Sequence, residues 1–163
     1  KIKWMVLKHG FVKVQKTISV KNGIYILEIF AKKDFTILAK KFIDQTFPKG
    51  YYYYIGSAQR NLDSRLSRHK KANKKIHWHI DHLTTLYSNI ITNIFVFDGV
   101  IKEGETYIAS NFQTLFNADI IVSGFGNSDT PNTKTHLFFK KTKINSSNIL
   151  SLKQTLISSN NLI

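Results

Sequence analysis

Two tripeptides that contain tyrosine stand beside strongly apolar runs of the chain. Gly23-Ile24-Tyr25 opens the run GIYILEIF, and Tyr54-Ile55-Gly56 ends the aromatic run YYYYIG. Both runs predict β-strands, because apolar and aromatic residues suit a pleated, half-buried surface. If the two strands pair antiparallel, Tyr25 and Tyr54 can project from the same face of the sheet.

An arginine, a histidine and a carboxylate add to these phenols. Arg65 and His69 are four residues apart in a predicted helix and share one side of it. Glu105 stands near the N-terminal end of a later predicted helix. An arginine stabilises charge on phosphoryl oxygens, a carboxylate holds a divalent cation, and a tyrosine or histidine orients or deprotonates the attacking water. The set suits phosphodiester hydrolysis.

The composition supports a folded, basic protein. The 163 residues include 24 Lys and Arg against 10 Asp and Glu, a formal net charge of +14. A hydrophobic content of 42% can bury a core, which excludes a disordered basic tail. The charge implies a polyanionic partner, with nucleic acid favoured over an anionic membrane surface. Cysteine is absent from the sequence, which excludes disulfides and thiolate metal sites.

The arginines identify which part of this charge is informative. All three arginines fall within nine positions directly behind the second tripeptide, whereas many of the lysines are expected only to solvate the surface. The planar guanidinium fork matches phosphate oxygens, so this segment is the predicted nucleic-acid face. Its predicted nucleic-acid-binding residues are Arg60, Arg68, Lys70, Lys71, Lys74 and Lys75.

Strand and helix patterns follow one another along the whole chain. Strands are predicted within 1–20 and over 23–30, 35–43, 51–56, 90–97, 120–125 and 137–139. Helices are predicted over 64–73, with Asn61 or Asp63 as N-cap, and over 78–87, 105–117 and 146–157, the last on the surface. Early strands with later interleaved helices predict a single α+β domain over 1–163, with its core at about 23–140 and a C-terminal helix and tail at 144–163.

The ordered set of motifs resembles the GIY-YIG nuclease superfamily over residues 23–136. GIY and YIG both occur literally, and the second continues as YIGSAQRNLDSRLSRH, which is typical of the superfamily's loop and following helix. A narrower branch in archaea and some bacteria is similar in its G-Y-Y-Y-x-G-S-A, R-H, W-H-I-D and G-F-G-x-S-D…H-L segments. The resemblance implies a small α+β domain with a central, mainly antiparallel sheet flanked by helices.

The resemblance also implies roles for single residues. Tyr25 matches the general base or water-positioning tyrosine, and Tyr54 matches a second tyrosine that positions water or phosphate. Arg65 matches the arginine that contacts the scissile phosphate, and His69 matches a histidine one turn further on. Glu105 matches the glutamate that binds the metal.

Some of these matches have rivals. His77 matches a further histidine found in some members, with His79 as its competitor. Glu103 competes with Glu105. Asp129 and His136 are possible accessory groups. The branch often carries cysteines after its S-D pair, where this chain has Thr130 and its neighbours, so a thiol role in that loop is not expected.

The expected function is that of a metal-dependent DNA endonuclease with one Mg²⁺ or Mn²⁺ ion. It is expected to be structure-selective or weakly sequence-specific, to act in DNA repair or processing, and to need no small-molecule cofactor. A cytoplasmic, nucleoid-associated protein without a secretory leader or membrane span is predicted. The alternative is a nucleic-acid-binding domain of the same fold that lacks turnover.

The string HWHIDH offers a second alternative, because it matches the zinc motif H-x-H-x-D-H of metallo-β-lactamase-like hydrolases. In that fold the motif follows a buried apolar strand and precedes small residues. Here a lysine-rich stretch precedes it and Leu83-Thr84-Thr85 follows. The match is therefore interpreted as chance, and bound zinc would revive it.

Overall fold

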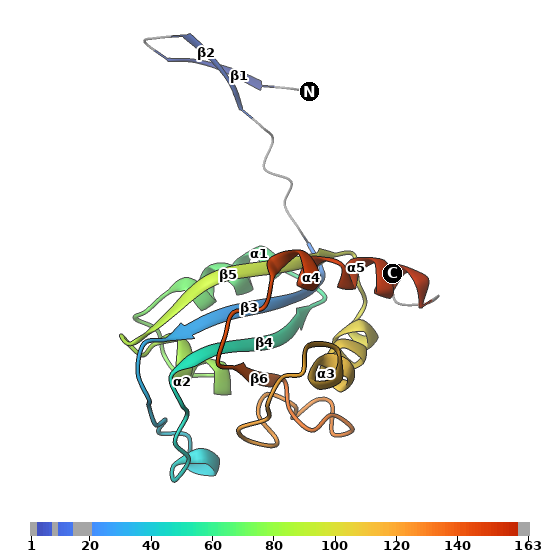
Figure 1. Ribbon diagram of the computed structural model, residues 1–163. Coiled ribbons are helices and arrows are strands. Elements are labelled where there is room, and N and C mark those ends of the chain that lie inside the picture. The colour runs from blue at the N-terminus through green and yellow to red at the C-terminus, as the bar shows by residue number, and fades with distance from the viewer. Residues whose placement is uncertain (1–2, 8–9, 15–20, 160–163) are drawn as a thin grey trace.

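The main sheet is antiparallel and has the strand order β5-β3-β4-β6 in the computed structural model, which describes residues 3–7, 10–14 and 21–159 (Figure 1). Its strands are β3 (Gly23–Ala31), β4 (Gly50–Ala58), β5 (Asn89–Asp98) and β6 (Leu137–Lys140). A separate two-stranded sheet pairs β1 (Lys3–Leu7) with β2 (Gly10–Val14). The predicted α+β class and the N-terminal strands are confirmed.

The register of β3 and β4 places the two predicted tyrosines on one face. Tyr25 pairs with Gly56 and Leu27 pairs with Tyr54, so the two tyrosines are diagonal neighbours. A side chain at Gly56 would place its Cβ 2.6 Å from the Tyr25 ring. The glycine of the second tripeptide therefore gives the Tyr25 ring room to lie across β4.

Helices cover both faces of the sheet and create two cores (Figure 1). The helices α1 (Leu62–Lys70) and α2 (His79–Thr84) contribute to the core that contains Tyr25 and Leu27. The helices α3 (Lys102–Phe116), α4 (Ser146–Leu150) and α5 (Leu152–Ser158) pack on the opposite face. Each buried Leu, Ile or Phe stabilises this arrangement by about 1.5–3 kcal/mol.

The predicted helices exist, but their limits and surroundings differ from the predictions. The helix α1 begins two residues before the predicted start and ends three before the predicted end, α2 is shorter at both ends, and α3 begins at Lys102. The predicted surface helix at 146–157 is two helices divided at Ser151. It is also not a surface helix, because Ile149, Leu152 and Leu156 are buried in the second core.

Two predicted strands are wrong. In the segment predicted as a strand over 35–43, residues 35–40 alternate between buried and exposed side chains. Only Phe35 forms a bridge there, with Phe47, before the 3₁₀ helix η1 (Lys40–Phe42). Alternation detects an extended chain with one buried face, and it cannot detect a missing partner strand. Residues 120–125 lead into turns, since Gly124 and Gly126 have φ of +78° and +71°, outside the β region. Among the described residues, no helix is long and apolar enough to cross a membrane.

Candidate active site

A cavity of about 580 Å³ lies where β3, β4, α1, α3 and the loop before β6 meet. The six predicted catalytic residues, Tyr25, Tyr54, Arg65, His69, His77 and Glu105, all line it. Arg60 of the predicted nucleic-acid face lines it as well. The fold therefore brings Tyr25 and Glu105, which are 80 positions apart in the sequence, to the same cavity.

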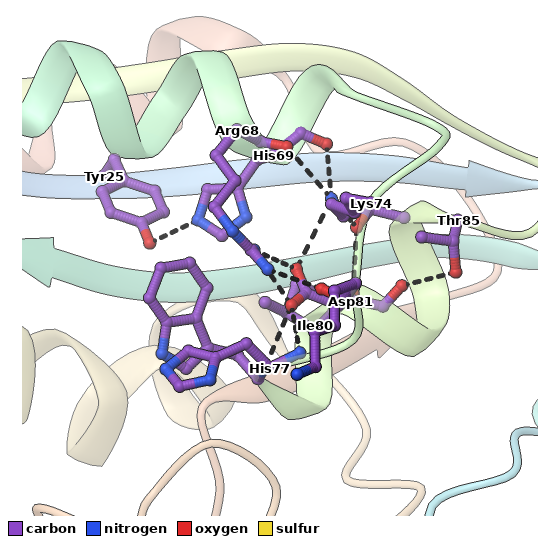
Figure 2. Close-up of polar contacts among 11 residues, drawn as sticks. Tyr25, Arg68, His69, Lys74, His77, Ile80, Asp81 and Thr85 are labelled. Atoms are coloured by element: carbon purple, nitrogen blue, oxygen red, sulfur yellow. Dashed lines mark hydrogen bonds and ion pairs between the residues drawn. The ribbon is translucent and has the colours of Figure 1, made fainter.

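A hydrogen bond joins the first tyrosine to the helix histidine. Tyr25 Oη lies 2.8 Å from His69 Nε2, and Figure 2 shows the phenol pointing at the imidazole. Burial raises the pKa of Tyr25 well above its ordinary value, although the nearby Arg65 charge opposes this. Burial, with the charge of Lys74, lowers the pKa of His69 to about 4. At neutral pH both groups are therefore uncharged.

Tyr54 lies beside this pair and is held by the loop before β6. Its ring centroid is 6.5 Å from that of His69. A Cβ at Gly126 would lie 2.8 Å from the Tyr54 ring. Burial, reinforced by Tyr25, raises the pKa of Tyr54 well above its ordinary value. The glycine of the late G-F-G segment thus lets the loop close against the second tyrosine.

Ser57 connects the carboxylate to the arginine. Its hydroxyl donates a hydrogen bond to Glu105 Oε2, and its carbonyl accepts one from Arg65 at 2.6 Å. Glu105 is 8% exposed and lines the cavity, whereas its rival Glu103 is exposed. The sequence did not single out Ser57, and its position directly after the second tripeptide is the signal that could have done so.

His136 approaches the same carboxylate from the loop before β6. Its Nδ1 lies 3.1 Å from Glu105 Oε1, and its Nε2 lies 2.8 Å and 3.0 Å from the hydroxyls of Thr130 and Thr133. Asp129 is exposed and lines the cavity. Of the two possible accessory groups, His136 therefore has the direct contact with a predicted catalytic residue.

Part of the basic segment forms a different structure, which we call the Asp81 cluster. Arg68 donates hydrogen bonds to both carboxylate oxygens of Asp81, at 2.7 and 2.9 Å, and Lys74 Nζ lies 3.5 Å from it (Figure 2). The backbone N–H groups of His77 and Trp78 each donate to it at 2.9 Å. Burial opposes ionisation, but these donors hold the pKa of Asp81 well below its usual range.

This arrangement adds a structural role to two of the cations predicted to bind nucleic acid. Arg68 also donates to the Lys75 carbonyl, and Lys74 donates to two backbone carbonyls and the Thr84 hydroxyl. Their donors are occupied inside the protein, whereas Lys70, Lys71 and Lys75 are exposed. The sequence could not show that a carboxylate thirteen positions beyond Arg68 would fold against it.

The histidine-rich string is not arranged as a zinc site. The oxygens of Asp81 are occupied by the donors just described, and His79 Nδ1 accepts a hydrogen bond from the Gly126 N–H at 3.3 Å. His79 lines the cavity beside its competitor His77, so the structure leaves both as neighbours of the site.

Trp78 links the cavity to the Asp81 cluster. The guanidinium carbons of Arg65 and Arg68 lie 4.7 and 4.4 Å from the centroids of its rings. Such stacking holds a guanidinium in a fixed plane. Trp78 also lines the cavity. Stacking on Trp78 therefore positions the predicted catalytic arginine.

The cavity fits a divalent cation that uses few protein ligands. Among the described residues, His, Cys, Asp and Glu side chains form no group of three or more that could hold a metal ion. Mg²⁺ commonly binds through one or two carboxylates, keeps several waters and takes substrate phosphates as further ligands. Glu105 Oε1 can serve as such a carboxylate oxygen, because the Ser57 hydroxyl occupies the other oxygen.

Comparison with known proteins places the chain in a family. The model described as "Domain of unknown function DUF123" matches residues 24–157, and the chain belongs to this GIY-YIG-like family. The match extends from β3 to α5 and so includes every residue that lines the cavity. Searches of curated proteins and of solved structures gave no match.

Proposed function

We propose that the cavity is the active site of a divalent-cation-dependent endonuclease that hydrolyses phosphodiester bonds of DNA in repair or processing. One observation carries this proposal: two phenols, an arginine, two histidines and a carboxylate from β3, β4, α1, α3 and the segment before α2 line a single cavity. Each side chain supplies a function that phosphodiester hydrolysis needs, and the hydrogen bonds between them are compatible with these functions.

Tyr25 and His69 can move the proton of the attacking water. The phenol accepts a proton from water while it donates its own proton to His69 Nε2, with which it is already hydrogen-bonded. His69 is uncharged at neutral pH because burial lowers its pKa to about 4, so it has a lone pair for this proton. The water O–H bond breaks as its oxygen attacks phosphorus, the bond from phosphorus to the leaving oxygen breaks, and the proton taken from water ends on the imidazole.

Arg65 supplies positive charge at the phosphate. It is fixed by stacking on Trp78 and by its hydrogen bond to the Ser57 carbonyl. A positively charged donor held in place before the reaction stabilises charge that develops on the phosphoryl oxygens. Arg60 and Lys102 also line the cavity and add to its positive potential.

Glu105 would hold the cation, which when bound polarises the phosphate and stabilises the leaving oxygen. The carboxylate itself is oriented by the Ser57 hydroxyl. Tyr54, packed beside His69, restricts the space above the pair and orients the phosphate or water.

A nucleic-acid substrate such as DNA is supported by exposed lysines that follow the cavity residue His69 in the chain. Lys70 and Lys71 lie at the C-terminal end of α1 and Lys75 follows them, all exposed. Lysine contacts with phosphates position a strand without identifying its bases. The enzyme is accordingly proposed to be structure-selective or weakly sequence-specific.

The test is cleavage of duplex, single-stranded, flap and branched DNA with Mg²⁺ or Mn²⁺ by the parent chain and by Glu105→Ala. We expect the parent to cut at least one of these substrates and Glu105→Ala to bind DNA without cutting it. A parent chain that binds DNA but cuts none of the substrates would instead support a nucleic-acid-binding domain without turnover. Normal cutting by Glu105→Ala would show that the metal ligand is assigned wrongly.

A further inference from the structure

One buried nitrogen of the cavity has no hydrogen-bond partner within the described part of the chain. His136 Nδ1 makes no hydrogen bond, although Glu105 Oε1 lies only 3.1 Å away. His136 is 1% exposed and lines the cavity. A buried polar atom without a partner is destabilising, so its retention at this place points to a ligand.

The hydroxyls on the other side of the ring can accept its proton. Thr133 can donate its hydroxyl proton to the Thr130 carbonyl at 2.9 Å, which leaves its oxygen to accept from His136 Nε2, 3.0 Å away. The Thr130 hydroxyl oxygen lies 2.8 Å from the same nitrogen. In the tautomer with the proton on Nε2, Nδ1 presents a lone pair toward the carboxylate.

A lone pair and a carboxylate oxygen repel each other unless a cation lies near both. The Ser57 hydroxyl already satisfies Glu105 Oε2, which leaves Oε1 as the oxygen that faces His136. Two neighbouring ligands at about 2.1 Å from an octahedral cation are about 3 Å apart. The measured separation of Nδ1 and Oε1, 3.1 Å, agrees with that spacing.

We propose that His136 Nδ1 is a second protein ligand, beside Glu105 Oε1, of the divalent cation in the cavity. This inference rests on the proposed function and makes it more specific. Carboxylate and water suit Mg²⁺ and Mn²⁺, whereas imidazole suits transition ions such as Fe²⁺ and Zn²⁺. A mixed nitrogen and oxygen site therefore favours a transition ion over Mg²⁺, and paramagnetic Mn²⁺ serves as its probe. Water and DNA phosphate complete the coordination.

The hydroxyls of Thr130 and Thr133 have a defined part in this site. Metal-bound histidines usually donate their other ring N–H to an oxygen, which fixes the tautomer and the ring orientation. The two threonines provide these oxygens for His136. The loop that carries them follows the G-F-G segment, so the late motif would orient one ligand of the cation.

The experiment is pulsed electron paramagnetic resonance of Mn²⁺ bound to the full chain, with a parallel Mn²⁺ titration. We expect a directly coordinated imidazole nitrogen in the parent spectrum. His136→Gln should lose that coupling and bind Mn²⁺ about 10- to 100-fold more weakly, by analogy with losses of supporting contacts at metal sites. His82→Gln, on α2 outside the cavity, is the matched control and should change neither.

The parent spectrum tests nitrogen coordination without any substitution, so a variant that fails to fold cannot obscure the result. Bound Mn²⁺ without nitrogen coupling overturns the inference, and so does coupling that survives His136→Gln, because His69, His77 and His79 also line the cavity. If coupling is absent but the parent cuts DNA, the inference fails and the proposed function stands. If coupling is present but no DNA is cut, the metal site stands and the proposed function fails.

Discussion

Arg65 and Arg68 lie nearly one turn apart on α1, and both guanidinium groups stack on Trp78. Arg68 donates three hydrogen bonds inside the protein, to the Asp81 carboxylate and the Lys75 carbonyl. Arg65 donates to the Ser57 carbonyl and lines the cavity. The positive charge of Arg68 therefore stabilises the fold, whereas that of Arg65 faces a cavity in which a ligand can bind.

The same contrast holds for the two regions that these arginines belong to. In the Asp81 cluster the buried carboxylate is met by two cations and two backbone N–H groups. In the cavity, the buried Nδ1 atoms of His69 and His136 make no hydrogen bond within the described residues. Saturated polar groups rigidify a structure, whereas unsatisfied ones are destabilising and mark places where a ligand completes the site.

The largest effect is expected from removal of the Tyr25 hydroxyl. Tyr25→Phe keeps the ring beside Gly56 but removes the bond to His69, so DNA cleavage should slow by about 10²- to 10⁴-fold, the usual contribution of a proton-transfer group. Single-turnover cleavage measures this. Tyr52→Phe is the control, because its hydroxyl bonds to the Pro48 carbonyl, and it should cleave at nearly the parent rate. Equal slowing by both substitutions would contradict the role of Tyr25.

Removal of the Asp81 carboxylate should affect stability most. Asp81→Ala leaves Lys74, whose side chain is 5% exposed, without its anion, so the free energy of unfolding should fall by about 3–5 kcal/mol. Denaturation with urea measures this, and Asp44→Ala, at an exposed aspartate, should change little. If Asp81→Ala is as stable as the parent, the cluster does not stabilise the fold.

The two regions should also lose stability at different pH. The His69 pKa falls from 6.5 in the unfolded chain to about 4, so the unfolded state binds more protons between these values. The free energy of unfolding should be largest above pH 6.5 and fall by about 3 kcal/mol as the pH drops to 4, at 1.36 kcal/mol per pKa unit. The fold also lowers the pKa of Asp81, so protonation of this carboxylate should lower the free energy of unfolding further below about pH 4. His69→Gln should remove only the first decline, and a decline unchanged by it would contradict this assignment.

The smallest effect is expected at the exposed lysines. Replacing Lys70 and Lys71 together by Gln should weaken DNA binding a few-fold. The slope of log affinity against log salt concentration should become shallower by about 1 for each lysine, because each loses one phosphate contact. Fluorescence anisotropy at several salt concentrations measures this. The double replacement of Lys32 and Lys33, which are exposed after β3, serves as control. A change of equal size in both pairs would show that binding has no defined face.

Much of this organisation could be predicted from the sequence. The apolar run GIYILEIF correctly predicted a strand, and Tyr25, Leu27 and Ile29 share one face of it because side chains alternate along a strand. The cavity could be predicted only because the motifs occur in an order that a known family shares. Local patterns could not reveal that residues 35–43 lack a partner strand, or that Arg68 and Lys74 bind Asp81, since both depend on contacts between distant residues.

The most direct test compares the two arginines of α1. Single-turnover cleavage of DNA, with each protein at saturating concentration, should be about 10²- to 10³-fold slower for Arg65→Gln than for the parent. Arg68→Gln should lower the free energy of unfolding but cleave at close to the parent rate where it remains folded. Cleavage by Arg65→Gln at the parent rate, or equal loss of cleavage in both folded variants, would contradict the assignment of the active site to the cavity.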